Sequence, residues 1–129
     1  MTDLTTQVRQ PGLSGAQAAN YAAIAAADFF TAIPGASYIL HYKNGATPTG
    51  SGIFSVTDPT TPIPSGSGAV AGFADGILKP TGAFAANTEF IARIPNSDRF
   101  RDSTGKINLV HGGGTLTTAT VAILGPFPA

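Results

Sequence analysis

The stretch Ser37-Tyr-Ile-Leu-His-Tyr-Lys-Asn-Gly45 decides the fold class of this chain. Its large side chains recur at every second position, which is the period of a strand with one buried face. Asn44-Gly45 closes the run, and this dipeptide is a strong hairpin signal because both residues tolerate positive φ. We therefore expect a hairpin that leads to a second strand at Ile53–Thr57. The residues expected to face the core are Tyr38, Leu40 and Tyr42.

Further along the chain, more short strands are separated by turn signals. The run 89–94 alternates again, with Phe90, Ala92 and Ile94 inward and Ile91 outward. Residues 102–105 predict a turn, in which Asp102 bonds the backbone two residues on and Gly105 supplies positive φ. The runs 106–111 and 116–124 predict a hairpin around Gly112-Gly-Gly114. Residues 58–68 contain three Pro and two Gly and predict a surface loop.

These patterns predict an all-β chain with little helix. About 130 residues is the length of one ordinary domain. Close spacing of short strands and turns is typical of a β-sandwich or a jelly-roll-like barrel. We assign this single domain to residues 28–129.

Residues 1–27 differ from the rest and predict an extended N-terminal arm. Pro11, Gly12 and Gly15 interrupt residues 1–15, for which a frayed terminus is the alternative interpretation. The segment Ala16–Ala27 is rich in Ala and lacks Gly and Pro, which favours a short helix. Twelve residues are marginal for a helix, so an extended segment stays open as the alternative.

The composition leaves few groups for catalysis. The 129 residues contain no Cys, no Trp and two His, and the only Glu is Glu89. No Gly-x-Ser-x-Gly nucleophile motif occurs. We therefore expect no enzyme activity, no metal site and no cofactor.

The charge is also low. Only 11% of the residues are charged, against about 25% in typical domains, and the net charge is +0. Neither nucleic acid nor a membrane surface would be attracted over long range. No run reaches the roughly 18 apolar residues of a membrane helix, and the N-terminus lacks a signal-peptide pattern. A weakly charged exterior is easier to understand if much of it is covered by other protein.

Three clusters of residues are candidates for a binding site. His41 and His111 would need carboxylates beside them to hold a metal, and a solvated or interface role is the simpler interpretation of His41. Residues 98–102 (Asp-Arg-Phe-Arg-Asp) could bind an anion, but pairing among these charges is favoured. The three Tyr residues could form a platform for sugars, although core packing is the better interpretation of those in the strand. They are Tyr21, Tyr38 and Tyr42.

Two segments carry a resemblance to a known family. Tyr38-Ile-Leu-His-Tyr-Lys-Asn-Gly45 resembles the aromatic-led strand ending in Lys-Asn-Gly of small all-β phage head proteins encoded near the major capsid gene. Ile94-Pro95, followed by Arg99-Phe100-x-Asp102-x-x-Gly105-Lys106-Ile107-Asn108, is similar to that family's proline, aromatic and Asp-Gly-Lys-Val-Asn pattern. The Thr-rich run 115–124 occupies the place of its closing strand. Residues 58–88 depart from the pattern as an insertion.

The resemblance implies a head decoration, or cement, protein of the virion, made in the bacterial host cytoplasm. Its partner would be the major capsid protein, and a homo-oligomer such as a trimer fits a symmetric shell. The alternatives are a carbohydrate-binding β-sandwich on the virion and another virion part, such as a head-tail or tail protein. The candidates for capsid contact are Leu4, Val8, Arg9, Leu13, Pro62, Ile63, Arg99 and Arg101.

Overall fold

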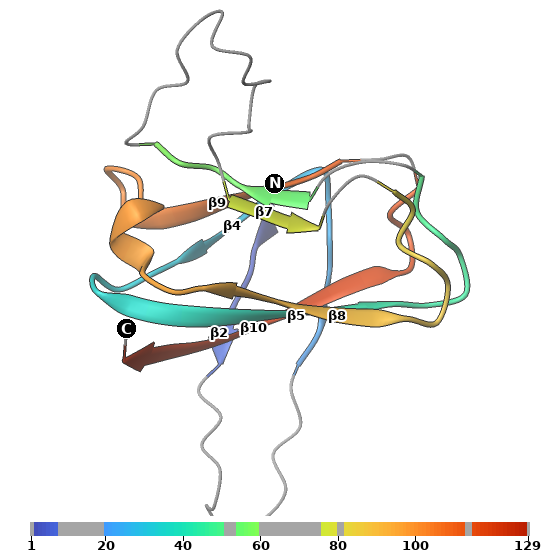
Figure 1. The fold of residues 1–129 in the computed structure, drawn as a ribbon, viewed down its shortest axis with the longest axis horizontal. Helices are drawn as coiled ribbons and strands as arrows, with labels where there is room; N and C mark the ends of the chain where they lie inside the picture. Colours follow the sequence, from blue (N-terminus) through green and yellow to red (C-terminus); the bar gives the residue numbers. More distant parts are fainter. Residues whose placement is uncertain are drawn as a thin grey trace, which may run out of the picture.

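The computed structural model describes residues 2–7, 20–50, 54–59, 76–79, 82–112 and 115–128. In this part of the chain the structure consists of short strands and one 3-10 helix (Figure 1), so the all-β prediction is confirmed. No helix among these residues is long and apolar enough to cross a membrane. The elements are β1 (Thr2–Asp3), β2 (Thr6–Gln7), β3 (Ala22–Ala23), β4 (Ala27–Thr31), β5 (Ala36–Asn44), β6 (Phe54–Val56), β7 (Gly76–Lys79), β8 (Glu89–Ile94), η1 (Ser97–Arg99), β9 (Lys106–His111) and β10 (Ala119–Pro128).

The strands form two sheets that face each other (Figure 1). The strand order in the first sheet is β1-β4-β9-β6-β7. In the second it is β2-β10-β5-β8, and β3 pairs with β10 beside β2. Neighbours are antiparallel except in the pairs β1–β4 and β2–β10. The architecture is a β-sandwich of two open sheets and not a closed barrel.

Strand β5 supplies the centre of the core. Tyr38, Leu40 and Tyr42 are buried, which confirms the alternation predicted for this strand. The ring of Tyr42 stacks on Phe90 of β8 at a centroid distance of 4.7 Å and lies 5.4 Å from Phe54 of β6. Aromatic side chains from both sheets therefore meet in the middle of the sandwich.

The predicted hairpin after β5 is wrong. Strand β5 pairs with β8 and β10, whereas β6 lies in the other sheet. Asn44 donates through its side-chain amide to the carbonyl oxygens of Thr47 and Phe84, at 3.0 and 2.8 Å. A Cβ on Gly45 would lie 3.0 Å from the Cβ of Thr118, and neither Asn44 nor Gly45 has positive φ. This dipeptide holds a corner where the chain crosses between sheets, and its Gly provides space for a neighbour.

The predicted hairpin of residues 106–111 with 116–124 is also wrong. Strand β9 pairs with β4 and β6 in the first sheet, and β10 pairs with β5 in the second. Both strands bury alternate apolar residues, such as Ile107 and Ile123. Two strands with one apolar face each can bury them by facing each other across the core as well as by lying side by side.

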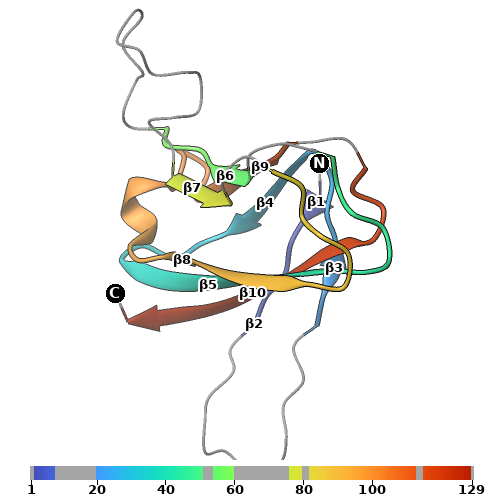
Figure 2. The ribbon, with the colours of Figure 1, turned by 45° about the vertical axis from the view of Figure 1, so that its right-hand side comes forward.

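The N-terminal region belongs to the sandwich and is not a separate arm up to residue 27. Figure 2 shows β1 beside β4. The two strands are parallel, and Thr2 pairs with Asp28. Leu4 is 2% exposed, and its backbone N–H donates to the carbonyl of Phe29 at 2.7 Å. Residues 20–27 hold β3 and the start of β4, so the helix predicted there is wrong, while residues 16–19 lie outside the described residues. The sandwich therefore begins at Thr2 and not at residue 28.

Candidate interaction site

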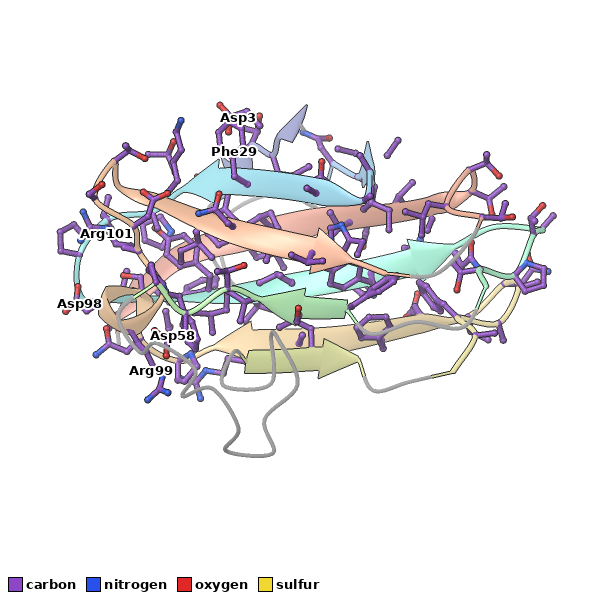
Figure 3. All side chains as sticks on the ribbon, turned by 90° about the horizontal axis from the view of Figure 1, so that it is seen from above. Asp3, Phe29, Asp58, Asp98, Arg99 and Arg101 are labelled. Atoms are coloured by element: carbon purple, nitrogen blue, oxygen red, sulfur yellow. The ribbon has the colours of Figure 1, made fainter. Side chains whose placement is uncertain are left out.

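Arg99 is the most exposed of the described contact candidates. It lies at the end of η1, and its side chain is 56% exposed. Its Nη2 atom is 3.0 Å from Oδ2 of Asp58, whose side chain has no exposed surface (Figure 3). The guanidinium therefore compensates a buried carboxylate on one side and still presents a surface to a partner on the other.

Arg101 has a more internal role. Its Nε donates to the carbonyl of Ala32 at 3.1 Å, and its Nη1 is 3.9 Å from Oδ1 of Asp98. The same Asp98 oxygen accepts from the backbone N–H of Gly35 at 2.9 Å. Arg101 and Asp98 thus tie the loop between β4 and β5 to the segment after β8. The predicted self-pairing of this charged cluster is confirmed for Arg101 with Asp98, while Arg99 pairs outside the cluster.

The turn at 102–105 confirms its prediction. Asp102 accepts hydrogen bonds from the backbone N–H and the hydroxyl of Thr104 at 2.8 and 2.6 Å, and Gly105 has a φ of 83°. The Asp102 carboxylate also accepts hydrogen bonds from the backbone N–H of Lys106 and the side-chain amide of Asn108. These bonds, chiefly those from the side chains of Thr104 and Asn108, hold the pKa of the Asp102 carboxyl well below its usual range. The turn is therefore fixed by a carboxylate in its charged form.

Of the candidates near the N-terminus, only Leu4 lies in the described residues. It is buried in the core, so the prediction that its side chain contacts a partner is wrong. Gln7 lies opposite Leu124 of β10, and Ala22 lies opposite Val121. The ends of segment 8–21 are therefore about 10 Å apart along β10. Val8, Arg9, Leu13, Pro62 and Ile63 lie outside the described residues.

A depression of about 230 Å³ lies beside these two ends. Leu4 and Val121 provide apolar surface in it, and Tyr21 and Asn20 come from the segment that leads into β3. The full lining is Asp3, Leu4, Thr5, Asn20, Tyr21, Ala22 and Val121.

A polar network that we did not predict lies in the core. Nε2 of His111 is 2.7 Å from the hydroxyl of Tyr42, and Nδ1 is 3.2 Å from Oδ2 of Asp28 and 2.9 Å from the carbonyl of Ala25. Both groups near Nδ1 accept hydrogen bonds, so Nδ1 carries the proton and Nε2 accepts from Tyr42. One clue was in the sequence, because His111 continues the inward phase of Ile107 and Leu109.

The network joins the two sheets. Asp28 and His111 come from β4 and β9, and Tyr42 comes from β5 of the other sheet. Burial lowers the pKa of His111, and burial together with the charge of Asp28 raises the pKa of Tyr42 well above 10. The order of carboxylate, imidazole and hydroxyl resembles a catalytic relay. Here all three side chains are buried, and they link the two sheets through the core.

The second His lies on the outer face of the second sheet. Nδ1 of His41 is 2.7 Å from the hydroxyl of Tyr21, and Nε2 is 3.5 Å from Oε1 of Glu89. Lys43 lies 4.9 Å from the centroid of the Tyr21 ring. Since Tyr38 and Tyr42 are buried, the core-packing interpretation is confirmed and the three-Tyr sugar platform does not form. No group of three or more His, Cys, Asp or Glu that could hold a metal occurs within the described ranges.

Comparison with protein-family models, with curated proteins and with solved structures gave no match for this chain.

Proposed function

We propose that this protein is a non-enzymatic structural component of a phage virion. It binds the outer surface of the head as a decoration protein and stabilises contacts between neighbouring major capsid subunits. The proposal includes a jelly-roll-like arrangement of the sandwich. The observation that carries it is the low charge of the exterior, which is lower still than the composition suggests.

Several of the fourteen charged residues are used inside the fold. Asp28 and Asp58 have side chains with no exposed surface, and Asp102 is bound by three neighbouring residues. Arg101 is directed to the loop between β4 and β5. A surface with so few free charges is poorly suited to a free monomer and well suited to contact with other protein.

The residues that carry the family resemblance have structural roles in this chain. Asn44 and Gly45 hold the corner at the end of β5, and Asp102 holds the turn before β9. A decoration protein needs a rigid core, because it gains stability from many weak contacts repeated over a symmetric shell. The two motifs supply that rigidity and leave the contacts to other segments.

Within the arm 2–15 and the loop 58–68, we assign the capsid contact to residues 8–15 and 60–68, with Arg99 as a charged contact. These segments contain Val8, Arg9, Leu13, Pro62 and Ile63. Simple truncation of the N-terminus would be a poor test, because Leu4 is part of the core. A replacement inside the segment is cleaner, since the flanking strands β2 and β3 stay in place.

The test uses two segment variants with purified shells that lack the protein. In one variant a Gly/Ser linker replaces residues 9–18, and in the other a linker replaces residues 61–70. Arg99→Ala adds a point substitution, and Lys43→Ala is its matched control at an exposed cation at the end of β5 that lies far from η1. Co-sedimentation gives the affinity, and circular dichroism with a thermal scan checks that each variant is folded.

The proposal predicts that the intact protein saturates the shells at a fixed ratio to the major capsid protein. At least one segment variant should remain folded and lose about 10-fold or more in affinity. No binding of the intact protein to the shells would refute the proposal. A stoichiometry of only a few copies per particle would also refute it and would favour a head-tail or tail protein.

A further inference from the structure

Strand β8 is an unusual edge. The other outer strands of the described sheets are short: β1, β2 and β3 have two residues each, and β7 has four. Strand β8 has six residues, pairs with β5 in unbroken register, and has no partner among the described residues on its other side. Long regular edges of this kind are usually protected in monomeric proteins by charged side chains, by Pro, by a bulge or by a covering segment.

The outer face of β8 has one large apolar side chain between two charged ones. Ile91, at its middle, is 68% exposed, the largest exposure among the described large apolar residues. Glu89 and Arg93 flank it at equal spacing on the same face. Arg93 has no ion-pair partner in the part of the chain that the structure describes.

The backbone N–H and C=O groups of β8 that do not bond to β5 belong to Glu89, Ile91 and Arg93, the residues of the outer face. The N–H of Asn44 donates to the carbonyl of Thr88 at 2.9 Å, so residue 88 and, by alternation, residues 90, 92 and 94 bond to β5. The N–H and C=O groups of Glu89, Ile91 and Arg93 therefore point to the open edge. An added antiparallel strand would bond to these three residues.

We propose that β8 pairs with β8 of a second copy of this chain, antiparallel and centred on Ile91. In this register Ile91 lies opposite its own copy, and Glu89 of each chain lies opposite Arg93 of the other. All three residues form hydrogen-bonded pairs, which gives about six backbone bonds across a two-fold axis. The outer face then has one apolar pair between two pairs of opposite charge, an arrangement that stabilises neighbouring strands.

Other registers are less favourable. A shift of two residues pairs Ile91 with Arg93 and places Glu89 opposite Pro95, which has no N–H to donate. The inner face also favours the centred register, because it places the large Phe90 opposite the small Ala92. Next to the edge lies an apolar depression of about 420 Å³, lined in part by Leu78, Phe84, Phe90 and Ile91, which the second copy would cover.

The first test is sedimentation velocity of the purified chain from about 5 to about 500 µM, the range in which a small interface associates. We expect a concentration-dependent dimer. Arg93→Glu places like charges opposite each other twice across the axis and should raise the dissociation constant about 10-fold or more. The double substitution Glu89→Arg/Arg93→Glu restores both pairs and should return it to within about 3-fold of the original value.

Ile91→Lys places two cations on the axis and should abolish the dimer. Ile33→Lys is the matched control, because Ile33 is 52% exposed in the loop between β4 and β5 and away from β8. All of these side chains are exposed, so the variants should keep the fold, which a thermal scan verifies. Amide exchange measured by NMR adds a structural readout. The N–H groups of Glu89, Ile91 and Arg93 should gain protection with rising concentration, while those of Phe90 and Ala92 should not.

Three results would overturn the proposal. A chain that stays monomeric over the whole range would show that Glu89 and Arg93 protect the edge from pairing. A dimer that neither Arg93→Glu nor Ile91→Lys weakens would place the interface elsewhere. A trimer would exclude this geometry, because the two-fold pairing of one edge closes after two copies.

Discussion

The buried pair of Tyr42 and His111 gives a sharp stability prediction. In Tyr42→Phe the ring keeps its volume, so no cavity forms and the only loss is the hydroxyl. Nε2 of His111 then lacks the donor that now lies 2.7 Å away, and the position is sealed from water. An acceptor left unsatisfied in the core costs about 1–3 kcal/mol. For a chain of this length that corresponds to a fall in Tm of roughly 4–12 °C.

Tyr21→Phe is the matched control for this prediction. It removes a hydroxyl from a second Tyr–His pair with the same 2.7 Å separation, but Tyr21 is partly exposed and water can replace the lost group. We expect a loss below about 0.5 kcal/mol. Urea unfolding of both variants at pH 7.5 measures the two values. Equal losses in the two variants would refute the assignment of Tyr42 and His111 as a dry link between the sheets.

Three further predictions concern other parts of the fold. The pKa of His111 is lowered in the folded chain, so the unfolded chain binds a proton more readily. The contribution of His111 to the free energy of unfolding is therefore fully present above about pH 7.5 and is lost as the pH drops below about 6.5. A larger free energy of urea unfolding at pH 5.5 than at pH 7.5 would contradict this. Gly125→Ala should cost about 1–3 kcal/mol more of unfolding free energy than Gly82→Ala. Both residues have a φ near 135°, but the new Cβ at Gly125 would lie 2.7 Å from an aromatic ring, whereas nothing lies within 4 Å of the one at Gly82. Thermal scans that show the larger loss for Gly82→Ala would contradict the packing argument. Arg99→Ala should lower the free energy of unfolding of the free protein by about 1–2 kcal/mol, because the enclosed carboxylate of Asp58 loses a cation 3.0 Å away. An unchanged urea midpoint would show that this pair contributes nothing to stability.

The sequence was sufficient to predict which residues of β5 and β8 face the core. Alternation identified Tyr38, Leu40 and Tyr42 in β5 and Ala92 and Ile94 in β8, because a strand's side chains point to opposite faces in turn. The turn at Asp102 was also predictable, since its bonds are local. These features depend only on residues close together in the sequence.

Strand partners could not be predicted in the same way. An apolar face is buried equally well by a neighbour in the same sheet or by a strand across the core, so the pattern of β9 and β10 does not distinguish the two. Asn44-Gly45 was misleading as a hairpin signal. Gly45 makes room for Thr118, which approaches closely from a distant segment, and does not serve a hairpin turn. The two-residue strands β1, β2 and β3 are too short to show any period.

In the candidate site, too, local contacts could be predicted from the sequence and long-range contacts could not. That Arg101 pairs with Asp98 was predictable from their spacing, whereas the pairing of Arg99 with Asp58 joins residues far apart in the sequence. The burial of Leu4 depends on the pairing of β1 with β4, which no local signal reveals. The buried network was partly visible, since His111 has an inward phase, but its partners come from two other strands.

The most direct test of the proposed function is cryo-electron microscopy of shells mixed with the purified protein, together with a heat challenge of the same shells. The proposal predicts regular density on the outer surface, fitted by the two-sheet sandwich, with residues 8–15 or 60–68 against the major capsid protein. It also predicts that decorated shells survive a higher temperature than bare ones. Bare shells with unchanged heat resistance at saturating protein would contradict the proposal.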